Sequence, residues 1–273
     1  TLSSSSAASD VYKRQIEDII KLDDNTYLVR CSTFIENFFD FFSIEPEEDT
    51  DATTVNGWIT EIIGDIPIYV AFDSADTWSA PEMFRFNDAL EPIDVAGCPP
   101  DGFSQTGQLW GNPLYDWEYH KKTGYDWWIR RIEHCFRLYD VVRIDHFRGF
   151  DEYWSVPYGD KTAENGKWEK GPGIELFEVL EEKIKDLDVI AEDLGFLTDS
   201  VRELLAESGY PGMKVLQFAF DESGESVYLP FRYDKNCIVY TGTHDNETTK
   251  GWLGNLTPVS YTHLRAHETR HDL

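Results

Sequence analysis

The most constraining feature of the sequence is a short apolar segment that ends in a group of charged residues. Residues 141–148 read Val-Val-Arg-Ile-Asp-His-Phe-Arg. The apolar part, rich in β-branched residues, predicts a buried strand. Burying charge is unfavourable unless the charges are paired, whereas catalytic acids do lie at the carboxyl ends of barrel strands. The segment therefore indicates a functional site, with a salt-bridged strand end as the structural alternative.

Two further predicted strands also end beside an acidic residue. Residues 187–191 lead into Glu192, and residues 237–240 lead into a loop that contains Asp245. Other strands are predicted over residues 66–71 and 213–218, and amphipathic helices over residues 126–139, 174–184 and 201–206. Strands that alternate with helices predict an α/β fold with a parallel sheet. Because a barrel gathers residues from the ends of many strands, a closed (β/α)8 barrel explains the repeated acids better than a doubly wound sheet does.

Composition restricts the partners of the chain. Of the 273 residues, 41% are hydrophobic and 15% are aromatic, which is typical of a globular protein. The formal net charge of −27 argues against nucleic acid and against anionic membranes, both of which require a basic surface. No apolar run approaches the ~18 residues of a membrane span. The four cysteines form no C-x-x-C pair, so we expect reduced thiols and a cytoplasmic protein.

The two ends differ in composition from the acidic body. Residues 1–15 are rich in serine and end in basic residues, and residues 258–273 are rich in histidine and arginine. We interpret both as foreign tails that resemble translated sequencing-adapter read-through. The second tail contains His267-Glu-Thr-Arg-His271, which matches the zinc motif H-E-x-x-H. That motif needs a buried helix and a further ligand, and only two residues follow it, so we expect no metal site.

A long insertion, over about residues 77–125, mixes aromatic residues with amides and glycines. Loops of this length in a compact domain are usually functional. Aromatic rings could stack on sugar faces while amides bind hydroxyl groups. A packed surface loop is the alternative, and on composition alone the more economical one.

The acids at the strand ends suit glycoside chemistry, in which two carboxylates flank the bond that is broken. Asp145 suits the nucleophile, because Arg143 lies on the same strand face and favours the ionised carboxylate. Glu192 suits the general acid, because it follows an apolar strand and burial raises a carboxyl pKa. Asp245, with His244 beside it, could bind sugar hydroxyls. A Mg²⁺ or Ca²⁺ site is the main rival, but arginine and histidine crowd these acids.

Several segments together resemble the 4-α-glucanotransferases, also called amylomaltases or disproportionating enzymes, of the α-amylase superfamily. The segments are GDIPIYVAFDSAD, GQLWGNPLYDW, VVRIDHFRGF, IAEDLG, PGMKVLQFAF and YTGTHDNETT, within about residues 64–254. The resemblance implies a (β/α)8 barrel with an inserted subdomain, no cofactor, and maltooligosaccharides or other α-1,4-glucans as substrates. It implies Asp145 as nucleophile, Glu192 as general acid/base and Asp245 as transition-state stabiliser.

The resemblance also implies substrate-binding residues. Arg143, His146 and His244 match positions that contact the sugar or the nucleophile, Asp73, Ser74 and Asp76 match the first signature segment, and Gln108, Trp110 and Asn112 match the loop that covers the substrate. Transfer of glucan segments with retention is the implied reaction. An α-glucan hydrolase and a non-catalytic glucan-binding fragment are the alternatives.

The sequence departs from the family pattern in three places. Gly102 stands where some members carry an aromatic ring, residues 16–62 do not match the expected preceding segment, and the expected last barrel strand is absent. We therefore expect a partial barrel over residues 63–257 that lacks the first and last strands. Residues 16–62 are left as an unplaced segment with an acidic linker. An incomplete barrel leaves strand edges unpaired, so we expect the chain to be less stable and less active than a complete enzyme.

Overall fold

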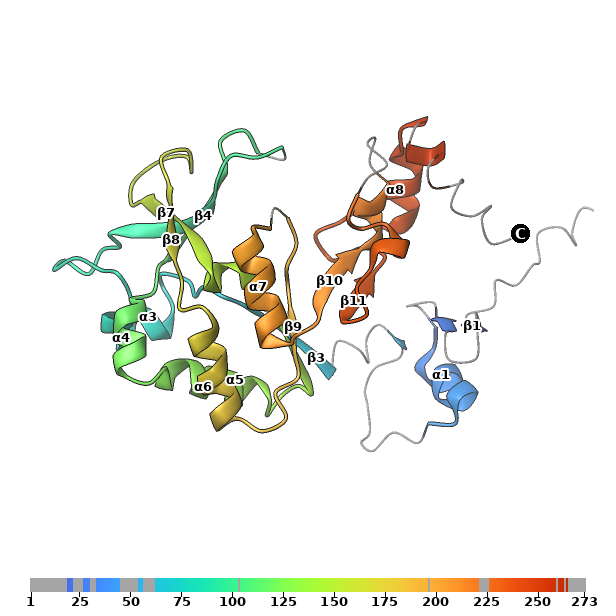
Figure 1. Ribbon diagram of the computed structural model, residues 1–273, viewed down its shortest axis with the longest axis horizontal. Helices are drawn as coiled ribbons and strands as arrows, with labels where there is room; N and C mark the ends of the chain where they lie inside the picture. Colours follow the sequence, from blue (N-terminus) through green and yellow to red (C-terminus); the bar gives the residue numbers. More distant parts are fainter. Residues whose placement is uncertain are drawn as a thin grey trace, which may run out of the picture. The chain divides into compact units, whose positions relative to one another are not determined.

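The computed structural model describes residues 19–21, 27–29, 33–44, 54–55, 62–102, 104–195, 197–220, 226–258, 260–262 and 264. The chain divides into two compact units, residues 1–63 and 64–273 (Figure 1). Each unit is treated below by itself.

The first unit contains a small hairpin and one helix. Strands β1 (Ile19–Lys21) and β2 (Tyr27–Val29) pair antiparallel, with Ile19 opposite Val29. Helix α1 (Ile35–Phe42) follows, and the Tyr27 ring meets the Phe42 ring edge-on at 4.8 Å between centroids. The aromatic segment 34–42, which the sequence left open between helix and strand, is therefore helical over most of its length.

The second unit alternates strands with helices. Its elements in chain order are β3 (Ile63–Pro67), α3 (Ala75–Ser79), η1 (Pro81–Met83), β4 (Asp94–Cys98), β5 (Gln108–Pro113), α4 (Trp117–Lys122), α5 (Asp126–Cys135), β6 (Val141–Asp145), η2 (Phe147–Phe150), β7 (Glu152–Pro157), β8 (Lys167–Lys170), α6 (Ile174–Lys183), β9 (Val189–Ala191), α7 (Asp199–Ser208), β10 (Gly212–Val215), η3 (Leu216–Ala219), η4 (Pro230–Arg232), β11 (Cys237–Tyr240) and α8 (Thr249–Asn255). The α/β fold class is confirmed.

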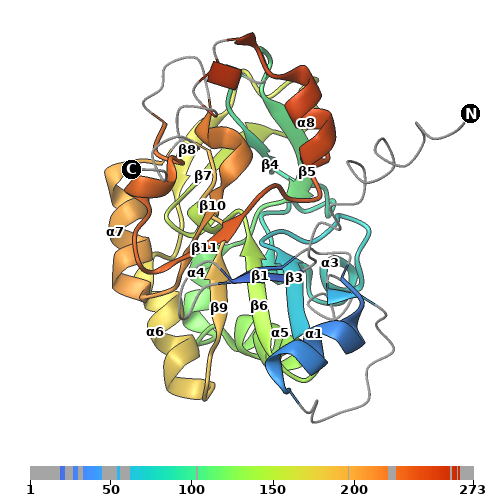
Figure 2. The same ribbon diagram turned by 90° about the vertical axis from the view of Figure 1, so that its right-hand side faces the viewer.

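The strands that carry the predicted acids lie side by side. β3, β6 and β9 form one sheet in that order (Figure 2), and β6 pairs with β9 in parallel. β10 and β11 form a second parallel pair. The Ala191 N–H donates to the Pro211 carbonyl at 2.9 Å, which connects the end of β9 to the start of β10. Within the described residues these strands form no closed barrel.

A second, antiparallel sheet has the order β5-β4-β7-β8. Strands β4 and β5 belong to the predicted insertion, whereas β7 and β8 follow the central strand β6. The insertion therefore contributes a strand pair to the hairpin of β7 and β8, since β4 pairs with β7 from Asp94 opposite Pro157 to Gly97 opposite Trp154. Non-local pairing of this kind leaves no local sequence signal.

An aromatic cluster packs directly beneath the end of β6. Phe147 and Phe150, on the turn η2, are fully buried. The Phe147 ring stacks on Phe177 of α6 at 5.0 Å between centroids, and Phe150 meets Trp128 of α5 edge-on at 5.3 Å. The turn that follows Asp145 is thus anchored in the core on both sides, and it cannot shift without disturbing α5 and α6.

Local signals explain where the helices begin and end. In α5, residues 128, 132 and 135 are buried, as the helical period requires of one face. Helix α7 begins at Thr198, whose hydroxyl accepts from the Val201 N–H at 3.4 Å, and ends at Gly209 with φ of 69°. The predicted helices at 126–139, 174–184 and 201–206 are confirmed, with shifts of a few residues at their ends.

Two predicted strands end earlier than expected. The strand predicted over 66–71 stops at Pro67, because the chain leaves the sheet: the Ile68 carbonyl accepts from the Tyr115 hydroxyl at 2.8 Å and from Arg131 at 3.0 Å. The strand predicted over 213–218 stops at Val215 and continues as the helical turn η3. The Ile68 N–H still donates to the Asp145 carbonyl at 3.2 Å, so at β3 the side-chain contacts take only the carbonyl side of the ladder.

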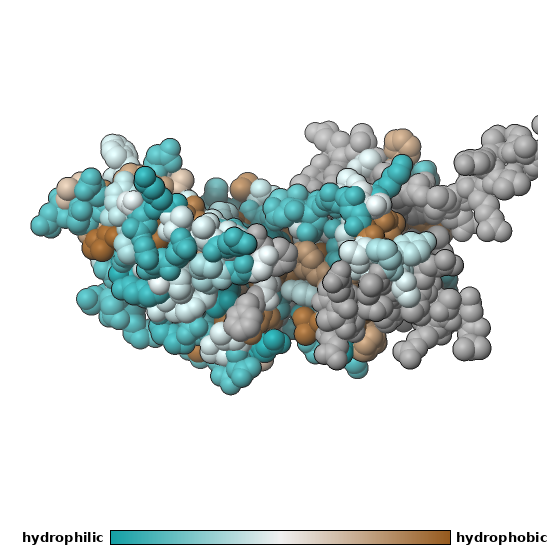
Figure 3. All heavy atoms as spheres, turned by 90° about the horizontal axis from the view of Figure 1, so that it is seen from above, coloured by the Kyte–Doolittle hydropathy of each residue, from teal (hydrophilic) through white to brown (hydrophobic). Residues whose placement is uncertain are grey.

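The surface seen in Figure 3 is mostly hydrophilic, in keeping with the acidic composition. None of the helices in the described part of the chain is long and apolar enough to cross a membrane. Cys98, Cys135 and Cys237 are free thiols, and Cys31 lies outside the described residues.

The core predicts a sharp contrast between two leucines. We expect Leu176→Ala, in α6 with 0% exposure, to lower the free energy of unfolding by about 2–5 kcal/mol, because it leaves a cavity in the aromatic cluster. Leu138→Ala removes the same atoms at a position that is 58% exposed, and its effect should stay below about 1 kcal/mol. Urea denaturation measures both. Equal effects of the two substitutions would contradict this placement of the core.

Candidate active site

The parallel pairing of β6 and β9 brings two of the predicted acids together. Asp145 is the last residue of β6, and Glu192 follows β9 directly. The strands are in register at Ile144 and Ala191, and the Glu192 N–H donates to the Ile144 carbonyl at 3.0 Å. Both carboxyl groups therefore belong to the same end of the sheet, as the sequence predicted from the strand endings.

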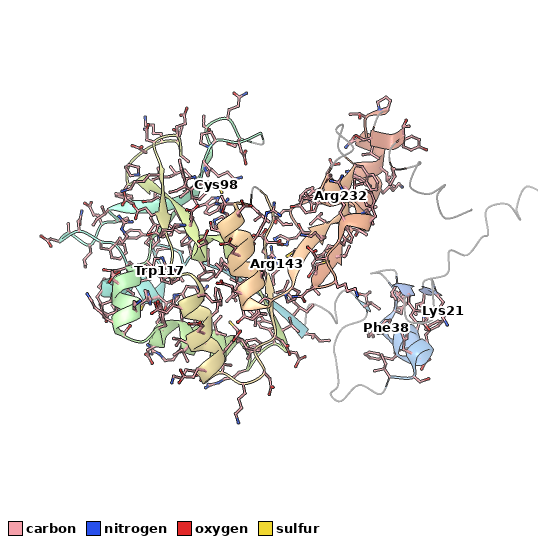
Figure 4. All side chains as sticks on the ribbon, viewed as in Figure 1. Lys21, Phe38, Cys98, Trp117, Arg143 and Arg232 are labelled. Carbon is pink, nitrogen blue, oxygen red and sulfur yellow. The ribbon has the colours of Figure 1, made fainter. Side chains whose placement is uncertain are left out.

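Arg143 binds two carboxylates at this end of the sheet (Figure 4). One of its terminal nitrogens lies 2.8 Å from Asp145, and the other lies 2.6 Å and 2.7 Å from the two oxygens of Asp65. The Arg143 side chain is only 10% exposed, whereas the side chains of Asp65 and Asp145 are each 45% exposed. The buried cation thus presents two carboxylates toward solvent.

Asp65 is a member of this group that the sequence did not identify. It lies on β3, between the buried residues Gly64 and Ile66. The one local sign that Asp65 has a special role is the presence of an acidic residue inside a short apolar strand. Its partner lies on a different strand, so the sequence alone did not indicate the pairing with Arg143.

The environment of Asp145 acts on its pKa in two directions. Burial raises the pKa of Asp145 above its ordinary value, while the Arg143 guanidinium opposes the shift by stabilising the ionised form. The carboxylate of Asp65 adds to the rise. Arg143 is therefore the group that favours the ionised form of Asp145.

Glu192 has a different environment. Its two oxygens accept main-chain N–H bonds from Leu194 at 2.7 Å and from His146 at 2.8 Å, which fixes the carboxyl plane. Burial raises the pKa of Glu192 to about 7, although both N–H donors favour the ionised form. Near neutral pH this carboxyl group is therefore able both to donate and to accept a proton.

His146 connects the acids to an aromatic wall. Its backbone is left-handed, with φ of 58°, and this conformation directs its N–H toward Glu192. Its ring meets the Trp110 ring edge-on at 4.7 Å between centroids. Burial lowers the pKa of His146 to about 3, so the imidazole is neutral. The His146 ring also packs closely against the backbone of Gly149. A Cβ added at Gly149 would lie 3.2 Å from the His146 ring and 2.8 Å from Ile68, so this packing depends on glycine.

A cavity of about 330 Å³ opens beside Asp145, His146 and Trp110. Its walls include Pro67, Tyr69, Trp110, Asn112, Asp145 and His146. Strand β5 supplies Trp110 and Asn112 from the antiparallel sheet. The Asn112 amide donates to the Val70 carbonyl at 2.9 Å, and the Trp110 indole N–H donates to the Gln108 amide at 3.0 Å. Rings, an amide and a carboxylate around one cavity suit a ligand with apolar faces and many hydroxyl groups.

The third predicted acid is held less tightly. Asp245 follows β11 in a loop in which the Asn246 side chain accepts from the Thr243 N–H at 2.8 Å. The Asp245 side chain is 73% exposed, and its carboxylate lies 3.5 Å from the His244 ring. It acts electrostatically on Asp145, whose pKa it raises. Asp245 therefore influences Asp145 electrostatically but does not line the cavity.

The segment at α3 lies outside this cavity. The Ser74 hydroxyl accepts from the Thr77 N–H at 3.3 Å and caps α3, and Asp76 accepts from the Trp127 indole N–H at 2.9 Å. Asp73 is exposed at the rim of a separate hollow. The structure thus gives Ser74 and Asp76 supporting contacts, and the role of all three in substrate binding stays a prediction.

No group of three or more His, Cys, Asp or Glu side chains that could hold a metal occurs among the residues that the structure describes. The H-E-x-x-H motif at 267–271 lies outside them.

Comparison with known proteins decides the family. A sequence model of the 4-alpha-glucanotransferase family matches residues 50–271. The chain belongs to the 4-alpha-glucanotransferase family. The family member of Clostridium butyricum is 59% identical over 194 residues, which are 71% of this chain and 40% of that protein. The chloroplastic/amyloplastic member of Solanum tuberosum is 49% identical over 195 residues, 71% of this chain and 34% of that protein.

Solved family structures agree. The amylomaltase of Streptococcus agalactiae, in complex with acarbose, superposes with a TM-score of 0.74 at 46% identity, over 78% of this chain and 43% of that one. The amylomaltase of Corynebacterium glutamicum gives a TM-score of 0.63 at 25% identity, over 74% of this chain and 28% of that one. The chain spans about two-fifths of the length of the curated 4-alpha-glucanotransferases that it matches.

The buried guanidinium predicts a pH-dependent loss of stability. We expect Arg143→Ala to lower the free energy of unfolding by about 2–4 kcal/mol near neutral pH, because Asp65 and Asp145 are left facing each other without a cation. The loss should shrink as the pH falls from neutral toward about 4, because burial raises the pKa of Asp145 and this carboxyl group takes up a proton on acidification. Urea denaturation across this pH range measures the effect.

Arg130→Ala is the matched control. Arg130 pairs with Asp126 on the surface of α5, where both side chains are well exposed. An exposed pair contributes little, so the change should stay below about 0.5 kcal/mol at every pH. An Arg143→Ala loss as small as that of the control would contradict a structural role for the Arg143 contacts.

Proposed function

We propose that this chain carries the catalytic centre of a 4-α-glucanotransferase, which moves α-1,4-glucan segments between maltooligosaccharides with retention. The observation that carries the proposal is the pair of unlike carboxyl groups on neighbouring strand ends. Asp145 is held by a buried guanidinium, and Glu192 has a pKa of about 7. Two carboxyl groups with opposite protonation requirements are what a retaining glycoside mechanism needs.

In the first step, Asp145 attacks the anomeric carbon of the donor glucan. The bond to the leaving glucan breaks, and protonated Glu192 transfers its proton to the departing 4-oxygen. A covalent β-glucosyl-enzyme and ionised Glu192 result. In the second step, Glu192 removes the proton from the 4-hydroxyl of an acceptor glucan, which displaces Asp145. The α-1,4 bond forms again, and both carboxyl groups return to their starting states.

The neighbouring residues have supporting roles in this scheme. Arg143 keeps the nucleophile charged, and the neutral His146 ring binds a hydroxyl of the reacting sugar. Asp245, with His244, stabilises positive charge that develops on the sugar ring in the transition state. Asp73, Ser74 and Asp76 complete the predicted substrate-binding set. The reaction uses no cofactor.

The substrate is an α-1,4-glucan that enters the cavity under Trp110. Gln108, Trp110 and Asn112 lie on β5, and Trp110 and Asn112 line the cavity together with Asp145. The related amylomaltase of Streptococcus agalactiae was solved with acarbose, which supports a saccharide-like ligand in this family. Transfer requires that an acceptor reaches the intermediate before water does, and a covering strand favours that outcome.

The parallel strands β6, β9, β10 and β11, together with β3, belong to a (β/α)8 barrel of the α-amylase type. Their order follows the chain, and helices α6 and α7 connect β6 to β9 and β9 to β10. A cytoplasmic location belongs to the same proposal.

Incubation with maltotriose tests the reaction. We expect a ladder of longer and shorter maltooligosaccharides, and we expect Asp145→Asn to reduce its rate by at least about 10³-fold, because the covalent intermediate can no longer form. Asp126→Asn, on the exposed surface of α5, is the matched control and should leave the rate unchanged. Glucose and maltose alone would indicate hydrolysis, and binding without turnover would indicate a glucan-binding fragment. Either result would contradict the proposal.

The pH profile tests the role of Glu192. The free enzyme must hold a proton on Glu192 to begin the reaction, so kcat/KM for maltotriose should fall as the pH rises past about 7. His244→Gln is the control for the exposed imidazole beside Asp245, and it should leave the position of this limb unchanged. An alkaline limb that disappears in His244→Gln would assign the titration to the imidazole and refute the role given to Glu192.

A further inference from the structure

The structure points to a second carbohydrate site beside the catalytic cavity. A hollow of about 300 Å³ is lined by Phe72, Asp73, Ser74, Trp78, Phe86 and Leu90, and we refer to it as the Trp78 hollow. It shares no lining residue with the catalytic cavity. We infer that the Trp78 hollow binds a distal stretch of an α-1,4-glucan whose reacting end occupies the catalytic cavity. This inference rests on the proposed function only for the identity of the ligand.

Three apolar side chains that line the hollow are strongly exposed. Trp78 is 87% exposed, Leu90 is 58% exposed and Phe72 is 44% exposed. Single apolar residues on a surface need no explanation, but several around one hollow mark a binding surface. The indole of Trp78 offers a flat apolar face together with an N–H donor, which suits a ligand that has apolar faces and a polar rim.

The chain holds Trp78 in this exposed position. Helix α3 is capped by Ser74, and Asp76 ties the helix to the Trp127 indole at 2.9 Å. Thr77 is buried, and its hydroxyl donates to the Phe72 carbonyl at 2.7 Å. The next residue along the helix is Trp78, whose side chain is exposed while its main-chain N–H donates to the Ser74 carbonyl at 3.3 Å. The contacts of α3 therefore fix the backbone that carries the ring, and a fixed backbone reduces the freedom lost when a ligand binds.

The base of the hollow is equally firm. The Phe72 ring meets the Phe86 ring edge-on at 5.8 Å between centroids, and Phe86 stacks on Phe84 at 5.6 Å. Phe84 is 4% exposed and belongs to the main core. The hollow is therefore continuous with the packed interior.

Charge favours a neutral polyhydroxyl ligand. Asp73 is exposed at the rim, where its carboxylate is able to accept hydrogen bonds from hydroxyl groups. The chain carries a formal net charge of −27, so an anionic ligand would be repelled. A glucan satisfies both the rings and the carboxylate.

The path between the two sites is short. Tyr69 lines the catalytic cavity and Phe72 lines the Trp78 hollow, so their Cα atoms lie within roughly 11 Å of each other. The connecting chain is fixed, since the Asn112 amide from the cavity wall donates to the Val70 carbonyl. A short oligosaccharide fills the catalytic cavity alone, whereas a longer one reaches both sites.

Calorimetric titration in an Asp145→Asn background, where no turnover occurs, tests the inference. We expect Trp78→Ala to raise the Kd for maltoheptaose by about tenfold and to leave the Kd for maltotriose unchanged. Trp78→Phe keeps a ring and should restore the affinity to within about threefold of the parent. Phe231→Ala removes another strongly exposed ring, at 65% exposure, and should change neither value.

Oxidation of tryptophan read by mass spectrometry gives an independent measurement. Trp78 should be protected by maltoheptaose and not by maltotriose. An unchanged maltoheptaose Kd in Trp78→Ala, or unprotected Trp78, overturns the inference while maltotriose binding leaves the proposed function standing. A parent protein that binds neither saccharide overturns both. Binding of a protein instead of a glucan at Trp78 would also overturn the inference of a second carbohydrate site.

Discussion

The contact between Arg143 and two carboxylates is the interaction on which the site depends. β3, β6 and β9 place Asp65, Asp145 and Glu192 at one end of a sheet in a chain with a large negative charge. Carboxylates so close together would take up protons or separate if no cation were present. Arg143 is buried against Met213 of β10, so its charge acts through a medium of low polarity, where it is most effective. The buried Arg143 cation therefore offsets the repulsion between Asp65 and Asp145, so that both carboxylates can lie close together in the folded chain.

The same arrangement makes the carboxyl groups of Asp145 and Glu192 unlike each other. Asp145 is bonded to a cation, whereas Glu192 is bonded to two neutral N–H groups and is more deeply buried. Hydrogen bonds from neutral donors fix the Glu192 plane without removing the penalty for its charge. The difference between the proton affinities of Asp145 and Glu192 therefore comes from the partners that each acid meets at the end of its strand, and not from the residue type.

The sequence predicted those features that depend on local pattern. Apolar runs that end in acids identified β6, β9 and β11, and helical spacing identified α5, α6 and α7. It missed Asp65, because the partner that gives this residue its role lies on another strand. It extended β3 past Pro67, since nothing local shows that Tyr115 and Arg131 bind the Ile68 carbonyl. Ser74 and Asp76 were expected near the substrate from resemblance alone, whereas their observed partners are Thr77 and Trp127.

The covering strand is the clearest case of a feature that only the folded chain contains. Trp110 reaches His146 because β5 pairs with β4, and β4 pairs with β7. β7 begins shortly after Asp145 and is joined to it through the buried turn η2. The wall of the cavity and Asp145 are thus connected through one antiparallel sheet, even though they are distant in sequence. Because the buried turn η2 joins β6 to β7, the strand pairing that positions Trp110 is continuous with the chain that positions Asp145 and His146.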